Sequence, residues 1–225
     1  ILTISVISDD NTRNELTTLG FENIDEILKD RINDAGYKTR AGALEAARFL
    51  TLEFPYRINY FYENGRLTGN KVDGEGRYYH EGLYLNESLY NNISKSQKGP
   101  AIWGCELYSN PIKKTDINGL DCSGFVTWAL LNGGFDVGDI GAGITAAKDL
   151  TQDVGTRKSN KKSLITDGTI KSGDLVHNTE AGGHIGMIVG IDDKYVYVAQ
   201  ALWYDEVGVI ITKDTYDDFV KRFPN

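Results

Sequence analysis

The chain has 225 residues, of which 40% are hydrophobic and 25% charged, an ordinary balance for a soluble globular protein. This length suits one large domain, or one domain with a small N-terminal appendage. The net charge of −8 argues against nucleic acid as a partner, because binding phosphates requires a basic surface. No apolar run approaches the length of a membrane-spanning helix.

The N-terminal part of the chain predicts a short strand followed by two helices. Residues 1–8 are β-branched and apolar, which predicts a strand or the tail of a preceding region. The spacing of apolar residues predicts one helix over 23–35 and a second over 39–54. We assign residues 1–36 to an N-terminal strand and helix appendage, and residues 37–225 to the main domain.

Residues 55–118 are rich in tyrosine, glycine and asparagine, and they lose the helical spacing of apolar residues. A stretch of this length without clear elements is expected in a compact domain only where it has a function. We interpret the part at about 63–118 as an insertion beside the site, where tyrosine rings suit a sugar- or peptide-binding groove. The alternative is that most of the rings pack the loop onto the core.

Residues 119–134 contain the strongest signal in the chain. Asp121 predicts a helix start at Cys122, because its carboxylate can accept the N–H groups of the first turn. Gly133 and Gly134 predict the helix end. The unpaired N–H groups and the dipole of a helix start favour a thiolate, which is the nucleophilic form of cysteine. The alternative is that Cys122 is a small buried hydrophobic residue.

The cysteines and histidines are too few and too scattered for a metal site. Cys105 and Cys122 do not make a disulfide scaffold, and we expect two thiols, since a bridge would consume the nucleophile. No short ligand spacing of the zinc type occurs, so no metal and no other cofactor is expected.

The last third of the chain predicts an antiparallel sheet, with turns between its strands. Together with the preceding helices it predicts an α+β fold, with N-terminal helices packed on a C-terminal antiparallel β-sheet. Continuous apolar runs in the middle strands predict burial on both faces. The expected elements are a turn at 138–143, a short helix at 144–154, a basic surface loop at 155–163, strands at 174–177, 184–192, 195–203 and 207–212, and a helix or edge segment at 216–223.

A nucleophilic cysteine needs a base and a group that orients the base. Among His80, His177 and His184, the last opens the strongest strand, which suits a thiolate–imidazolium pair beside a helix start. A hairpin turn centred near 192–193 brings Gln200 within one residue of the partner of His184. Its amide oxygen can then accept the imidazole N–H, the orienting role in a triad. The alternative is a buried glutamine bonded only to backbone.

Three short motifs occur in a fixed order: D-C-S-G-F-V at 121–126, G-D-L-V at 173–176 and H-I-G-M at 184–187. In this combination the chain resembles the NlpC-type cell-wall peptidases, papain-like bacterial cysteine peptidases that cleave peptidoglycan stem peptides. The resemblance covers residues from about 120 to 212. It implies a papain-like fold with the nucleophile at a helix N-terminus.

The resemblance also implies roles for individual residues. Cys122 would be the nucleophile, His184 the base and Gln200 the third polar residue, at a position where the family often has histidine and also accepts glutamine. The best match to the family's upstream tyrosine, which reaches the nucleophile, is Tyr60. Asp121 and Ser123, which flank the cysteine, complete the expected substrate and oxyanion side of the site.

The expected function is therefore hydrolysis of amide bonds in peptidoglycan stem peptides, and the bond between D-glutamate, through its γ-carboxyl, and a diamino acid is the expected target. Two alternatives stay open: an acyl- or amidotransferase that uses the same thioester, and a non-catalytic wall- or protein-binding module. The chain starts at Ile1 rather than methionine, which is expected of a piece of a longer protein, and a secretion signal, if the protein had one, would already be removed. We expect a monomer that works outside the cell or in the cell envelope.

Overall fold

The computed structural model describes residues 24–54, 58, 60, 82, 120–135, 137, 154–179, 183–202 and 208–225. Within them the chain is α+β, as predicted, with helices and a four-stranded antiparallel sheet. The helices are α2 (Ile24–Ala35), α3 (Arg40–Arg48), the π-helical turn η2 (Phe49–Glu53), α6 (Cys122–Asn132), α8 (Lys162–Thr166) and α9 (Tyr216–Arg222). The strands are β1 (Leu175–Asn178), β2 (His184–Ile191), β3 (Tyr195–Leu202) and β4 (Gly208–Thr215).

The N-terminal helices form where their apolar spacing predicts them. The buried face of α2 consists of Ile24, Leu28 and Ile32, which recur every three or four residues. Thr39 caps α3, because its side chain accepts the N–H of Gly42. The second predicted helix continues past Arg48 as η2, so one apolar segment changes its hydrogen-bond pattern rather than ending.

The sheet is a meander in which each strand pairs with the next one along the chain. Met187 lies opposite Ala199, but Ile191 lies opposite Val196, so the register shifts by one residue between Ile188 and Gly190. A β-bulge of this kind bends a strand and changes which residues face each other. It alters the register expected from a simple two-residue turn.

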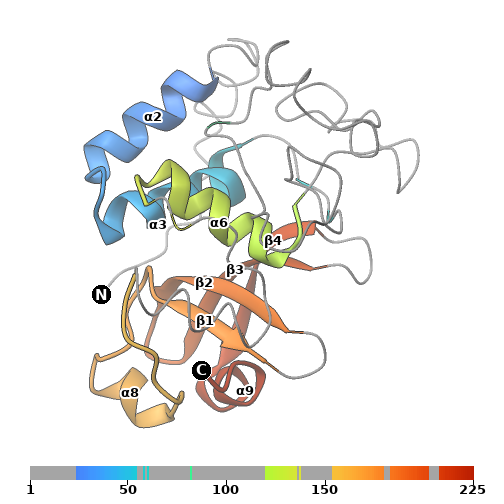
Figure 1. Ribbon diagram of the computed structural model, residues 1–225. Helices are drawn as coiled ribbons and strands as arrows, with labels where there is room; N and C mark the ends of the chain where they lie inside the picture. Colours follow the sequence, from blue (N-terminus) through green and yellow to red (C-terminus); the bar gives the residue numbers. More distant parts are fainter. Residues whose placement is uncertain are drawn as a thin grey trace.

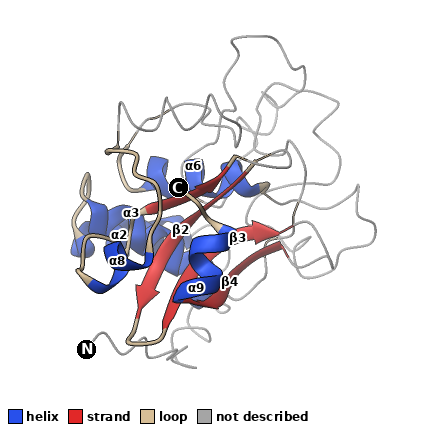
Figure 2. Cartoon of the chain, turned by 90° about the horizontal axis from the view of Figure 1, so that it is seen from below, coloured by secondary structure: helices blue, strands red, loops and turns tan. Residues whose placement is uncertain are grey.

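Helices cover both faces of the sheet. Figure 1 shows α2, α3 and α6 on one side, with α8 and α9 on the other. Figure 2, turned by 90°, shows α9 lying over β3 and β4, which it contacts. One core cluster joins α2, α3 and α6 to Ile185, Met187 and Ala199, and we call it the helical cluster. The second joins Ile188, Val196 and Val198 to Phe219 and Phe223, and we call it the α9 cluster.

Some sequence-based predictions fall on other parts of the chain. The strand at 1–8, the turn at 138–143, most of the helix at 144–154 and the insertion at about 63–118 lie outside the described residues, apart from Gly82. The division at residue 36 stays a prediction, although α2 contributes to the same helical cluster as α3 and α6. The short helix α8 begins at Lys162, near the end of the segment 155–163 predicted as a basic loop, and continues beyond it to Thr166. Among the described helices, none is long and apolar enough to cross a membrane.

Candidate active site

Cys122 is the first residue of α6, and Asp121 caps this helix as predicted. One carboxylate oxygen of Asp121 accepts the N–H of Gly124 at 2.7 Å and the hydroxyl of Ser123 at 3.2 Å. All of these groups are buried, so the carboxylate replaces water at the N–H groups that begin the helix. The Cys122 residue is itself 6% exposed and belongs to the helical cluster.

The structure brings His184 and Gln200 together across β2 and β3. The imidazole Nε2 lies 2.6 Å from the amide Oε1, and the Gln200 side chain is fully buried. A Cβ built on Gly186 would lie 3.3 Å from the Cβ of Gln200, so His184 and Gln200 are diagonal neighbours on one face of the sheet. An amide oxygen only accepts, so with this end of the amide toward the ring the proton belongs on Nε2, and Nδ1 is the basic nitrogen.

The two faces of β2 carry different chemistry. Ile185 and Met187 face the helical cluster. The ring of His184 packs instead against Phe223 of the α9 cluster, with ring centroids 6.0 Å apart and planes inclined by 26°. Cys122 lies in the helical cluster, on the helix that packs against β2 and β3. Contact between the thiol and the imidazole stays a prediction.

The surroundings of His184 favour its neutral form. Burial lowers the pKa of the imidazole below its ordinary value of 6.5, because a charged ring loses hydration there. The hydrogen bond to Gln200 opposes this and raises the pKa, while the charges of Arg222 and His177 lower it further. A neutral imidazole at neutral pH can accept a proton, which is the state a general base needs.

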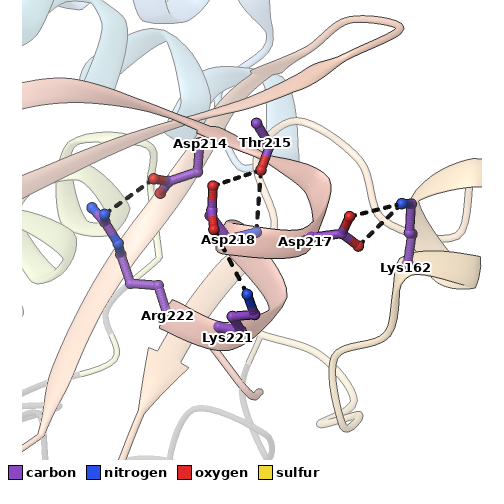
Figure 3. A network of polar contacts seen from close by, with 7 residues as sticks. All are labelled: Lys162, Asp214, Thr215, Asp217, Asp218, Lys221 and Arg222. Atoms are coloured by element: carbon purple, nitrogen blue, oxygen red, sulfur yellow. Dashed lines mark hydrogen bonds and ion pairs between the residues drawn. The ribbon is translucent and has the colours of Figure 1, made fainter.

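Arg222 of α9, whose charge lowers the pKa of His184, pairs with Asp214 of β4, and Figure 3 shows this pair with the polar contacts around it. Arg222 lies 3.1 Å from the buried carboxylate of Asp214, and burial is the main cause that raises the pKa of Asp214. Lys162 of α8 contacts Asp217 at 3.0 Å, but both side chains are exposed, so this pair contributes little to stability. The buried carboxylate of Asp214 therefore fixes a guanidinium near the imidazole.

The remaining predicted site residue, Tyr60, is half-buried and packs against the helical cluster. Cys105 and His80 lie outside the described residues. His177 lies on β1 and is buried. Within the described part of the chain, no group of three or more His, Cys, Asp or Glu side chains is arranged to hold a metal ion.

A cavity of about 420 Å³ borders β1, within the size range of ligand pockets. Its lining reaches Ile185, the residue next to His184, so the cavity adjoins the strand that carries the imidazole. Among the described residues that line it, none is a predicted site residue, although His177, one of the three histidines weighed as the base, is present. The described part of its lining includes the cationic side chains Arg40, Arg157 and Lys158.

Sequence reasoning missed two contacts of the pair. Phe223 packs on the imidazole, and Thr212 of β4 accepts a hydrogen bond from Gln200 Nε2. The sequence placed Thr212 on the strand after β3. Which residue of β3 it would face depends on where the loop between the two strands begins and ends, and apolar spacing does not give that.

No protein-family model matches the chain, and no curated protein or solved structure matches it either.

Proposed function

We propose that this chain is a papain-like cysteine peptidase that hydrolyses amide bonds in peptidoglycan stem peptides, at the D-γ-glutamyl-diamino acid bond. The observation that supports it most is the 2.6 Å contact between His184 and Gln200 on the sheet against which α6 packs. Thiol catalysis requires a base oriented by a polar group and a cysteine within its reach. The structure supplies the oriented base and a cysteine at a capped helix start, and the proposal adds that the two meet.

The reaction follows from these groups. His184 Nδ1 takes the proton of the Cys122 thiol, and the thiolate attacks the amide carbonyl to form a tetrahedral intermediate. The backbone N–H of Cys122 at the start of α6, with Tyr60, stabilises the oxyanion. The imidazolium then protonates the leaving amine as the C–N bond breaks. Water, deprotonated by His184, attacks the thioester and releases the acid and the thiol.

Digestion of purified peptidoglycan and defined muropeptides, followed by mass analysis of the products, tests this proposal. Cleavage by the wild-type chain should disappear in Cys122→Ala, because the nucleophile is removed. Cys105→Ala is the matched control and should keep activity. If wild type and Cys122→Ala behave alike on every wall chemotype tested, the hydrolase proposal is wrong. Adding a primary amine separates hydrolysis from transfer, since a transferase would yield the amide product.

The burial of Cys122 favours a second candidate, a non-catalytic binding module. A residue that is 6% exposed and belongs to a core cluster has the surroundings of a structural cysteine. Alkylation at mildly acidic pH distinguishes the two. A Cys122 thiol that His184 deprotonates should label faster than Cys105, and His184→Gln should slow the labelling. Slow, equal labelling of both cysteines would support the binding module.

A further inference from the structure

Three polar side chains lie in a row across the sheet, one on each of β2, β3 and β4. His184 Nε2 contacts Gln200 Oε1 at 2.6 Å, and Gln200 Nε2 donates to Thr212 Oγ1. The Thr212 hydroxyl is in turn 3.5 Å from the carbonyl oxygen of Val198, to which it donates. The row therefore ends on the backbone of β3.

Strand register holds this row in place. Thr212 lies opposite Val198, and Gln200 lies opposite Ile210 in the same β3–β4 pairing. The amide of Gln200 therefore meets the threonine of β4 on one side and the imidazole of β2 on the other. Because Gln200 is fully buried, an amide group that lost a partner here would have no ready replacement from solvent.

An amide can be turned by 180° without changing its shape, so something must decide which end faces the imidazole. With Oε1 toward His184, the imidazole Nε2 must carry a proton, and Thr212 must accept. With the amide reversed, Thr212 would have to donate to Oε1 and release the Val198 carbonyl. His184 Nε2 would then have to accept, which moves the ring proton to Nδ1. The hydroxyl has one proton, and the Val198 carbonyl is its acceptor in the first arrangement.

We infer that Thr212 is a positioning residue: by accepting from Gln200 and donating to Val198 it fixes the amide, and through the amide the proton of His184 on Nε2. This inference rests on the proposed function for its consequence, because Nδ1 must be unprotonated to take the thiol proton of Cys122. The hydrogen bonds of Thr212 in this row run to Gln200 and to Val198. Its effect reaches the ring only through Gln200.

Nitrogen-15 NMR of histidine-labelled protein, at a pH where the ring is neutral, reads the tautomer directly. The His184 signals are assigned by their loss in His184→Gln. Wild type and Thr212→Ser should carry the proton on Nε2. Thr212→Val has the same shape but no hydroxyl, and should show an increased population with the proton on Nδ1. Thr166→Val removes an exposed threonine hydroxyl elsewhere and is the matched control.

Two outcomes would overturn the inference. In one, His184 of the wild-type protein is protonated on Nδ1. In the other, His184 of the Thr212→Val variant has the same tautomer population as in the wild type. Thr212→Ala also removes the hydroxyl and gives the same test if the valine variant does not fold. In the peptidase assay, Thr212→Val should lower kcat about tenfold with little change in KM, the size of one lost hydrogen bond, while Thr212→Ser keeps kcat.

The two proposals fail separately. If Cys122→Ala retains full activity while the tautomer still depends on Thr212, the peptidase proposal is wrong and the role of Thr212 in orienting the amide stands. If Cys122 is essential while the tautomer and kcat ignore Thr212, only the positioning role is wrong.

Discussion

The surroundings of His184 have opposing effects on its pKa: one group favours the charged form of the imidazole, and several features disfavour it. Burial and the charge of Arg222 lower its pKa, while the Gln200 amide raises it. We therefore expect an NMR titration to give His184 a pKa below the ordinary 6.5. Arg222→Gln should raise that pKa, because a nearby positive charge is removed, and Gln200→Leu should lower it. Shifts in the reversed directions would contradict this account of the site.

The same pKa predicts how His184 contributes to stability. Because the pKa is lower in the folded state, the unfolded chain binds the proton more readily. The contribution of the neutral ring is therefore complete above the ordinary value of 6.5, and it is lost as the pH falls through the folded pKa. Urea unfolding between neutral and mildly acidic pH should show a smaller loss of stability in His184→Gln than in wild type. Glu45 and Asp214 have raised pKa values that act in the opposite direction, so the difference between the two chains is the quantity to measure.

At the scale of single residues, the sequence predicted the contact between His184 and Gln200. It did not predict the contacts of Thr212 and Phe223 with this pair. Two strands joined by a short turn bring their facing residues together, so the partner of His184 could be counted to within one residue. The bulge between Ile188 and Gly190 alters that count, and both Thr212 and Phe223 come from beyond the next loop. Residues that meet across a short turn can be paired by counting from the turn, but residues from more distant segments cannot be paired in this way.

Among the elements, α6 depends on its cap. Replacing Asp121 by alanine leaves the N–H of Gly124 and the hydroxyl of Ser123 without their buried acceptor. We expect Asp121→Ala to cost about 1 kcal/mol of unfolding free energy, the usual value for a lost N-cap. Asp121→Asn keeps an acceptor oxygen and should lose much less. Equal urea midpoints for alanine and wild type would show that the cap contributes nothing.

The pairing of β2 and β3 depends on a glycine. A Cβ on Gly186 would lie 2.8 Å from Val198 Cγ1 and 3.0 Å from the Ala199 carbonyl oxygen, which is too close. Gly186→Ala should therefore push the strands apart, lower stability by about 1–3 kcal/mol and weaken the His184–Gln200 contact. Gly155→Ala is the matched control, because nothing lies within 4 Å of the added carbon. Chemical denaturation compares the two variants.

The order and type of the long elements could be predicted, because apolar spacing and glycine or aspartate boundaries act locally. The strands start and end within a few residues of the prediction, and α9 takes the helical alternative considered for its segment. The short helix α8 was missed: it has five residues and no side-chain cap, so its segment carries little beyond a basic composition. The π-helical turn η2 was missed because apolar spacing does not distinguish hydrogen-bond patterns.

For the whole molecule, the sheet separates two cores that serve different parts of the site. The helical cluster contains Cys122, and the α9 cluster contains Phe223 against the imidazole. The two proposed partners in catalysis thus depend on different sets of packed side chains. Length predicted one large domain, with or without an N-terminal appendage, and apolar spacing predicted helices packed on a sheet. Which face each residue occupies depends on register and on the bulge, which apolar spacing does not give.

The meander has a consequence for how the chain folds. Each strand pairs with its neighbour in sequence, whereas α3 contacts β2 across more than a hundred residues and α2 packs on α3. Contacts that close short loops form early. Val198→Ala should therefore mainly slow refolding, and Leu28→Ala should mainly speed unfolding, in stopped-flow measurements. On this order of events the base and its orienting amide meet first, and the distant helices complete the molecule afterwards.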